Sequence, residues 1–169
     1  ARQALAAGAD WVNDIWGFKQ EPEIAKISAD ANCPVVLMHN GRNRERQNKD
    51  DGAGGYYGYW HYDDVVGEVK AELLESVEIA LQAGVAPHNI ILDPGIGFGK
   101  TQAQNLELLR RLDEIVALGF PVLLGTSRKG FIGQVLGGLP APDRVEGTLA
   151  TTALGIASGA AIVRVHDVK

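Results

Sequence analysis

The chain has 169 residues, 46% of them hydrophobic and 22% charged, which is enough for one domain with a core that needs no disulfide or metal to fold. Its net charge of −5 argues against nucleic acid or an anionic membrane as the main partner, so an anionic ligand would need a local cluster of basic side chains. Because Cys33 is the single cysteine, and because we see neither a leader-like segment nor an apolar run long enough for a membrane span, we expect a cytoplasmic protein.

Short apolar runs rich in Val, Ile and Leu predict strands that are buried on both faces. In chain order these runs cover residues 11–15, 34–39, 90–93, 121–126 and 160–166. Helical patterns precede them, at residues 1–7, 21–31, 62–83, 101–118 and 144–158. Glycines follow three of these helices as stop signals, and Pro142 with Asp143 is suited to cap the last one. Such alternation predicts a parallel sheet with helical crossovers.

Polar residues stand at or just beyond the carboxyl ends of all five predicted strands. They are Asn13, Asp14, His39, Asp93, Ser127, Lys129, Arg164 and His166. A site built from many strand ends is typical of a (β/α)8 TIM barrel, whereas a doubly wound sheet concentrates its site at one switch point. Because a complete barrel takes about 250 residues, we expect one domain over 1–169 that supplies roughly the last five strands. The chain begins and ends within predicted elements, so we expect a piece of a longer polypeptide.

Asp93 directly follows three apolar strand residues, and burying its carboxylate is costly unless something pairs with it. One candidate partner is a neighbouring Arg or Lys. The other is a ligand that offers two adjacent N–H donors, which a carboxylate accepts in bidentate fashion. Asn13 could add a donor and an acceptor to the same ligand edge.

A second cluster is cationic. Lys129 and Ser127 follow one buried strand, while Arg164 and His166 alternate with valines so that both point to one side of another. Such a cluster of cationic donors is suited to bind phosphate or pyrophosphate. For Arg128 a surface salt bridge is an equally good interpretation.

The glycine-rich run from Gly95 to Thr101 ends like a phosphate-binding P-loop, but Pro94 occupies the position of its first glycine. We therefore interpret it as a tight turn that lets a flat ligand approach, with Phe98 as an apolar wall; a plain turn without a ligand is the alternative. The spacing of the histidines disfavours a zinc site. We place His88 on the surface and leave His39, His61 and His166 open between structure and function.

Five segments together resemble dihydropteroate synthase, in order and at suitable spacing over nearly the whole chain. They are Asn13-Asp14-Ile15, Val36-Leu37-Met38-His39, Leu92-Asp93-Pro94-Gly95-Ile96-Gly97-Phe98-Gly99-Lys100, Gly125-Thr126-Ser127-Arg128-Lys129 and Arg164-Val165-His166-Asp167-Val168. The resemblance implies a TIM barrel of folate biosynthesis. It also implies a transferase that condenses 6-hydroxymethyl-7,8-dihydropterin diphosphate with p-aminobenzoate and releases pyrophosphate.

The resemblance also implies a role for individual residues. The pterin would bind to Asn13, Asp93, Met38, Phe98 and Lys129. The diphosphate would bind to Arg164, His166 and Asn13, and p-aminobenzoate to Lys129, Ser127 and Phe98. Asp93 and Lys129 would be the catalytic pair, with Asp93 stabilising the cationic pterin methylene that is left when pyrophosphate departs.

Parts of the family pattern have no counterpart here, namely the first strand with its Mg²⁺-binding asparagine, a Thr-Arg substrate loop and a further pterin-binding aspartate. We therefore expect Mg²⁺ as a cofactor held from outside this chain, a homodimer at full length, and an inactive isolated chain. Residues 40–61 are long, charged and glycine-rich, which favours a mobile loop over an interface element.

Two alternatives remain. The first is the pterin-binding domain of a methyltetrahydrofolate–corrinoid methyltransferase, which would use Asn13 and Asp93 but has no diphosphate to neutralise. The second is a non-catalytic pterin-binding fragment.

Overall fold

The computed structural model describes residues 1–40, 46–47 and 59–168. Along these ranges the elements begin with helix α1 (Arg2–Ala6), strand β1 (Val12–Asp14), α2 (Glu23–Ala31) and β2 (Val35–Met38). Two short strands follow, β3 (Arg46–Gln47) and β4 (Tyr59–Trp60), and then α3 (Val65–Gln82), a 3-10 turn (Pro87–Asn89) and β5 (Ile90–Asp93). The chain continues through α4 (Gln102–Arg110), α5 (Leu112–Val116), β6 (Leu123–Leu124), α6 (Gly130–Val135), a second 3-10 turn (Ala141–Asp143), α7 (Val145–Ala157) and β7 (Ile162–Val163).

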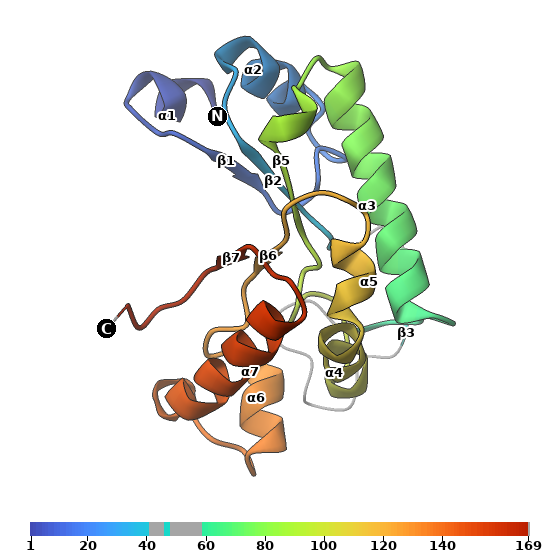
Figure 1. Cartoon of the computed structure of the whole chain (residues 1–169), viewed down its shortest axis with the longest axis vertical. Coiled ribbons are helices and arrows are strands. Elements are labelled where there is room, and N and C mark those ends of the chain that lie inside the picture. Colours follow the sequence, from blue (N-terminus) through green and yellow to red (C-terminus); the bar gives the residue numbers. More distant parts are fainter. Residues whose placement is uncertain (41–45, 48–58, 169) are drawn as a thin grey trace.

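The strands that were predicted as buried lie side by side in chain order and run parallel. β1 pairs with β2, and β2 with β5, in a register that places Met38 opposite Asp93. A bridge between Leu92 and Val122 connects β5 to the start of the β6 segment, and β6 pairs with β7. Figure 1 shows α3 and α5 along the same side of these strands and α7 beside β6 and β7. The fold is thus α/β, with a parallel arrangement whose carboxyl ends point the same way.

β2, β5 and β6 are buried on both faces, because two separate apolar clusters lie against them. β1 and β7, which were predicted to be buried in the same way, are only partly covered. The larger cluster packs alternate strand residues such as Leu37 and Leu92 against the helices, with Leu73 of α3 at its centre. The smaller cluster lies on the opposite face and consists of Val36, Ile91 and Leu123 with Ile162 beside them. Side chains alternate along a strand, so the residue two places after each member of this cluster projects from the same face at the strand's end. Those residues are Met38, Asp93, Gly125 and Arg164.

The structure confirms the five predicted strand positions, although four of the strands are shorter than the apolar runs and only β5 has its full predicted length. It corrects the single helix predicted over 101–118, which breaks at Arg111 into α4 and α5. It also contains α6, which the sequence did not predict, since two glycines weaken this short helix and the burial of Phe131 and Ile132 stabilises it. Asp143 lies in the 3-10 turn, and Arg144 is the N-cap of α7.

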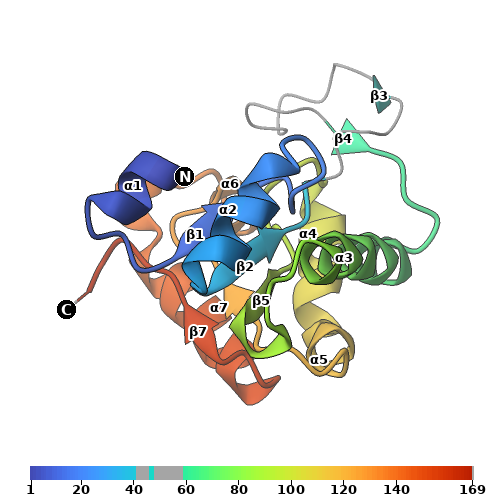
Figure 2. The same ribbon diagram turned by 90° about the horizontal axis from the view of Figure 1, so that it is seen from above.

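None of the helices in the described ranges is long and apolar enough to cross a membrane. Figure 2 shows the same elements from above, with α2 and α3 close to β1, β2 and β5. The proposal of a mobile loop over 40–61 concerns residues that mostly lie outside the described ranges. Asn40 is described, and its side-chain amide donates to the carbonyl of Ile15 (3.1 Å).

Candidate functional site

Asp93 ends β5 as a buried carboxylate, 2% exposed. Its Oδ1 accepts a hydrogen bond from the backbone N–H of Gly95 (2.8 Å), and its Oδ2 lies 3.4 Å from Nη2 of Arg164. Burial raises the pKa of Asp93, and the Gly95 hydrogen bond and the charges of Arg164, Lys129 and Lys100 oppose that rise. Three cations therefore act on one carboxylate, so the local charge is positive although the chain is acidic overall.

Arg164 connects the two ends of the parallel arrangement. Its guanidinium lies 3.3 Å from Oδ1 of Asn13 on β1 as well as 3.4 Å from Asp93 on β5. A Cβ at Gly125 would come within 2.7 Å of Nη2, so glycine at this position leaves the space in which the guanidinium lies. The Arg164 side chain is 46% exposed, and its donors are open to a ligand from solvent.

Lys129 follows β6 and lies over the glycine-rich loop. Its Nζ is 4.1 Å from the centroid of the Phe98 ring, a cation–π contact. Gly97 has a φ of 81°, and a Cβ there would come within 2.9 Å of the Lys129 Cδ, so glycine lets the loop and this side chain pack closely. Burial lowers the pKa of Lys129, the charge of Asp93 opposes this and that of Arg164 adds to it.

Ser127 and His166 meet beside this group. Ser127 Oγ accepts from the backbone N–H of His166 (3.0 Å) and lies 2.9 Å from its ring Nδ1. Arg128, by contrast, forms a bidentate ion pair with Asp167, which is the salt-bridge interpretation of that residue. Arg128 has a positive φ of 55°, and its N–H donates to Thr148 Oγ1 (3.0 Å), so the backbone turns sharply between Ser127 and Lys129.

The loop after Asp93 depends on two residues that the sequence analysis did not single out. Asn105 of α4 accepts from the N–H of Gly97 (2.7 Å) and donates to the carbonyl oxygens of Lys100 and Thr101. Lys100 is buried, with its ammonium among the carbonyls of Gly95 and Phe98 and the ring of His39. The sequence did contain an indication of the role of Lys100. A lysine in a glycine-rich turn after a buried strand has backbone carbonyl oxygens close by, to which its ammonium can donate.

The other polar or buried residues at the strand ends differ in whether they face the candidate site. Met38 is buried opposite Asp93, on the face of the site. Asp14 turns away into a local turn, where its carboxylate accepts from the N–H groups of Phe18 (2.6 Å) and Trp16 (3.3 Å). His39 points toward α3 and contacts Glu72 and Lys100.

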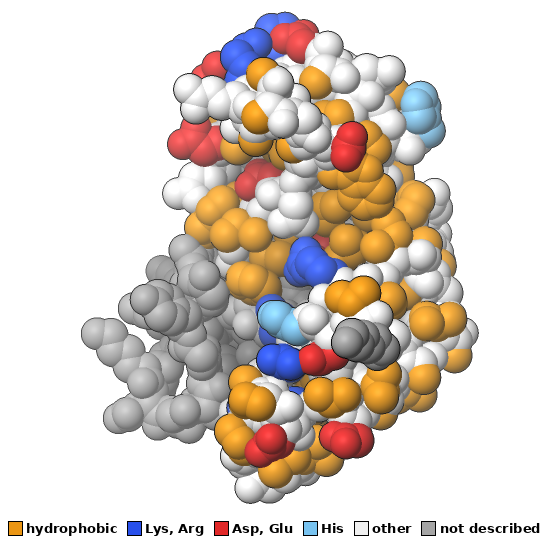
Figure 3. Space-filling model, turned by 90° about the vertical axis from the view of Figure 1, so that its left-hand side faces the viewer, with side chains coloured by type: hydrophobic (Ala, Val, Ile, Leu, Met, Phe, Trp, Pro, Cys, Tyr) orange, Lys and Arg blue, Asp and Glu red, His pale blue; other side chains and the backbone are white. Residues whose placement is uncertain are grey.

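His88 is exposed, as predicted, and His61 is exposed beside Asp63 (2.9 Å). Figure 3 shows Lys, Arg and His side chains gathered in the middle of one face, between hydrophobic patches.

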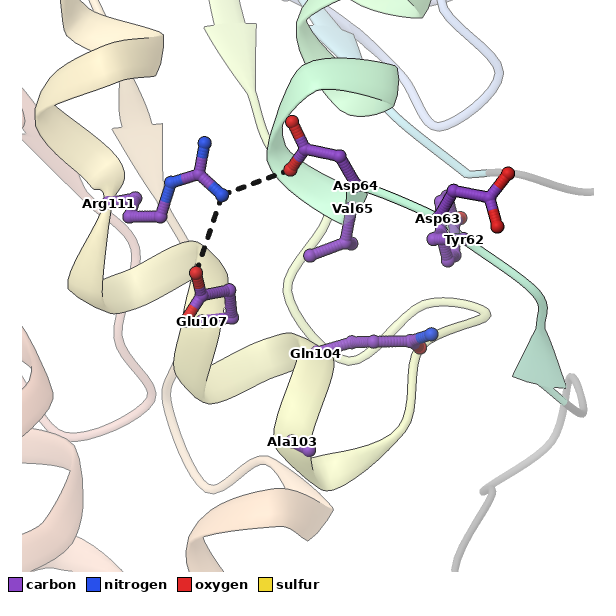
Figure 4. Close-up of a pocket in the computed structure, with 8 residues that line it drawn as sticks. All are labelled: Tyr62, Asp63, Asp64, Val65, Ala103, Gln104, Glu107 and Arg111. Atoms are coloured by element: carbon purple, nitrogen blue, oxygen red, sulfur yellow. Dashed lines mark hydrogen bonds and ion pairs between the residues drawn. The ribbon is translucent and has the colours of Figure 1, made fainter.

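A separate hollow of about 360 Å³ lies between the start of α3 and α4 (Figure 4). Arg111 projects toward it and pairs with Asp64 (3.0 Å) and Glu107 (3.4 Å), and also with Glu114 (2.6 Å). These ion pairs raise the pKa of Arg111. The pKa of Asp64 is lowered first by a hydrogen bond from the backbone N–H of Gly67 and then by Arg111. Arg111 thus links the start of α3 to α4 and α5, so we interpret this network as structural.

Comparison of the sequence with known proteins identifies the family to which the chain belongs. The family model described as "Pterin binding enzyme" matches residues 1–166. The dihydropteroate synthase of Bacillus subtilis is 49% identical over 169 residues, which cover all of this chain and 53% of that protein. The Synechocystis dihydropteroate synthase is 49% identical over 170 residues, covering 100% of this chain and 55% of the relative. The chain thus spans about half the length of the curated relatives it matches.

Solved structures agree with the sequence matches. The dihydropteroate synthase of Xanthomonas albilineans in complex with 7,8-dihydropteroate superimposes with a TM-score of 0.85 at 40% identity, over 99% of this chain and 57% of that one. The Thermus thermophilus enzyme in complex with 4-aminobenzoate gives a TM-score of 0.83 at 39% identity, over 98% of this chain and 60% of that one. The chain therefore belongs to the family of pterin-binding enzymes, and these relatives within the family are dihydropteroate synthases.

Proposed function

We propose that the complete protein containing this chain is a dihydropteroate synthase. It condenses 6-hydroxymethyl-7,8-dihydropterin diphosphate with p-aminobenzoate to give 7,8-dihydropteroate and pyrophosphate. The observation that carries this proposal is the buried carboxylate of Asp93 with Arg164 and Lys129 around it, since the carboxylate suits a pterin edge and Arg164 suits a diphosphate. The TM-scores and ligands of the solved relatives support it.

The proposed binding roles follow the geometry. Asp93 and Asn13 accept and donate along the amino-pyrimidinone edge of the pterin, and Lys129 and Phe98 lie beside its ring. Arg164 moves from Asp93 and Asn13 onto the diphosphate, where it is joined by His166. Ser127, Lys129 and Phe98 line the approach of p-aminobenzoate. Met38 is buried, so its contact with the ring requires a small movement of the side chains above it.

In the proposed reaction the bond between the pterin methylene carbon and the diphosphate oxygen breaks, and its electron pair leaves with pyrophosphate. The positive charge left on the pterin is stabilised by Asp93, whose ionised form is favoured by the three surrounding cations. The neutral amine of p-aminobenzoate then forms the new C–N bond and loses a proton. No side-chain nucleophile is required, and binding that orients the two substrates supplies much of the acceleration.

Mg²⁺ is the cofactor that the family resemblance implies. Within the described residues no three His, Cys, Asp or Glu side chains are grouped so that they could hold a metal ion. We propose that its protein ligand lies outside this chain, and no step above depends on the ion.

We further propose that the chain forms part of a TIM barrel, contributing its later strands, and that the complete protein is a cytoplasmic homodimer. The parallel order of neighbouring strands and the small apolar cluster on the face opposite the helices support the barrel. The free, buried thiol of Cys33 agrees with a reducing compartment. Leu149, Leu154 and Ile156 of α7 are exposed large apolar side chains of the kind that a subunit interface covers.

The test is an assay of the complete natural polypeptide for pyrophosphate release. We expect release from the pterin diphosphate only when p-aminobenzoate is present, and formation of dihydropteroate in equal amount. The isolated 169-residue chain should show no turnover. Pterin binding without pyrophosphate release, or methyl transfer from methyltetrahydrofolate to a corrinoid, would overturn the proposal.

A further inference from the structure

The ammonium of Lys100 is buried in the loop that follows Asp93. The residue is 4% exposed, and Nζ lies 3.0 Å from the carbonyl oxygen of Gly95, from that of Phe98 and from Nδ1 of His39. An ammonium is costly to bury unless its donors are satisfied, and these three acceptors match its three N–H groups. The contacts join the loop to the end of β2.

His39 is held in one protonation state by this contact. An ammonium can only donate, so Nδ1 of His39 must accept, and the ring proton is then on Nε2. Nε2 lies 3.0 Å from Oε2 of Glu72 on α3. Burial lowers the pKa of His39 to about 4, with Lys100 and, more weakly, Lys19 acting in the same direction and Glu72 opposing them. The ring is therefore neutral at pH 7, between a cation and an anion.

The two carbonyls that Lys100 binds belong to residues that shape the candidate site. Gly95 donates its N–H to Oδ1 of Asp93 (2.8 Å), and the Phe98 ring lies 4.1 Å from Nζ of Lys129. The charge of Lys100 also opposes the rise in the pKa of Asp93. One buried side chain thus acts on both residues that we propose as catalytic.

We propose that Lys100, oriented by His39 and Glu72, is a positioning residue of this site: it holds the loop so that the Gly95 N–H faces Asp93 and the Phe98 ring supports Lys129. Its kinetic consequence rests on the proposed function. Its structural consequence does not, so the two can fail separately.

The first test needs no substrate and is made on the wild-type protein. In the complete polypeptide labelled with ¹⁵N-histidine, we expect His39 to show a protonated Nε2 and an unprotonated Nδ1 from about pH 5 to pH 8. The resonances are assigned by their loss in His39→Asn. A protonated Nδ1, or a titration near the ordinary pKa of histidine, would overturn the inference.

The second test removes the charge of Lys100 with little change of volume. In Lys100→Met we expect kcat/KM to fall by on the order of 10- to 100-fold. We also expect the ¹³C carboxyl titration of Asp93 to move to higher pH, because a positive charge and the anchoring of the Gly95 N–H are lost together. The other groups that act on Asp93 are the Gly95 N–H, whose position the inference assigns to Lys100, and the charges of Arg164 at the end of β7 and Lys129 after β6, which the variant leaves in place.

Lys26→Met, on the exposed face of α2, is the matched control and should behave as wild type. A folded Lys100→Met protein with an unchanged Asp93 titration would overturn the inference. If the wild type has no synthase activity, the proposed function fails, and the Asp93 titration and the His39 tautomer still decide this inference.

A third comparison separates positioning from mere packing. His39→Asn keeps an oxygen that can accept from Lys100 near the place of Nδ1, whereas His39→Leu keeps volume without an acceptor. We expect His39→Asn to retain most of the wild-type kcat/KM and Asp93 titration, and His39→Leu to resemble Lys100→Met. Equal behaviour of the two variants would contradict the role given to His39.

Discussion

Burial disfavours the ionised form of Asp93 and raises the pKa of its carboxyl group. The carboxylate is kept by one backbone N–H and by cations, of which the half-exposed Arg164 lies 3.4 Å away. The sequence left open whether Asp93 pairs with an internal cation or with a ligand. In the structure it has an internal cation, Arg164, but the distance of 3.4 Å is long for an ion pair. An incompletely paired carboxylate is a group that a ligand can stabilise, at the expense of the stability of the free protein.

We therefore expect Asp93→Asn in the complete polypeptide to lower kcat/KM by on the order of 10² to 10³, because the nearly isosteric amide lacks the charge that we propose stabilises the pterin cation. The melting temperature should stay unchanged or rise, since a desolvated charge is removed. Steady-state kinetics and thermal unfolding on one preparation check both, with Asp30→Asn on α2 as a surface control. A large loss of stability with specific activity preserved in the folded fraction would show that Asp93 is structural.

Arg164 is the residue that we propose as the main cationic contact of the diphosphate. Arg164→Ala should weaken binding of the pterin diphosphate by about 1.5 to 3 kcal/mol, the scale of hydrogen bonds to a charged group. Calorimetric titration of the complete polypeptide measures this. Arg110→Ala is the control, since Arg110 is a surface residue paired with Glu107 on α4. Unchanged affinity in Arg164→Ala would remove Arg164 from the diphosphate site.

Among the elements, the segment between β5 and α4 has the most specific requirements. Thr101 begins α4 with a capping box in which its Oγ1 accepts from the N–H of Gln104 and its own N–H donates to that side chain. Gly95, at a φ of 67°, lies against the backbone of His39, and a Cβ there would collide with the His39 carbonyl oxygen. This segment therefore has little freedom to adjust to a larger residue.

Gly95→Ala should lower the free energy of unfolding by about 3 kcal/mol or more, since strain at positive φ is added to a clash with rigid backbone. Gly119→Ala is the matched control, because Gly119 also has a positive φ (87°) but a Cβ added there would meet nothing within 4 Å. We expect about 1 kcal/mol there. Urea unfolding of both variants provides the measurement, and equal losses would mean that the close approach to His39 has no energetic effect.

Elements could be predicted where local pattern and burial agree. The run Ile90–Asp93 is a strand over its full predicted length, because every residue is apolar or ends the strand. The break at Arg111 was invisible to periodicity, since apolar positions continue in phase across it while Arg111 pairs with Asp64 on another element. Helix α6 was not predicted because its sequence has a low helix propensity. It forms because burial of its apolar side chains outweighs that low propensity.

For the whole molecule, the buried neutral His39 predicts a loss of stability in mild acid. Its pKa is about 4 in the folded protein, against 6.5 for an ordinary histidine, so the unfolded chain binds more protons between these values. The stabilisation is present above about pH 6.5 and is lost as the pH falls toward 4. Between pH 7 and pH 5 we expect the free energy of unfolding to fall by about 2 kcal/mol from this group.

Urea unfolding at the two pH values measures the change, and His39→Asn should lack this part of it. Asp93 acts in the opposite direction, because its raised pKa makes the folded state bind a proton more readily. The comparison is therefore repeated in Asp93→Asn, where the acid-induced loss should be larger. An identical pH dependence in wild type and His39→Asn would mean that His39 is not buried in the neutral form.

The sequence by itself determined the α/β class, the strand positions and which polar residues stand at the strand ends. It could do so because parallel strands end at a common edge, so polar residues that follow buried runs must meet there, as Asp93, Arg164 and Lys129 do. Only the tertiary structure decided the partners. Arg164 meets Asn13 across 151 positions, Lys100 meets His39 across 61, and Arg128 pairs with Asp167 instead of facing a ligand. These pairings depend on the side-chain direction and on the distance between elements far apart in the chain, and neither is encoded in a local pattern of residue types.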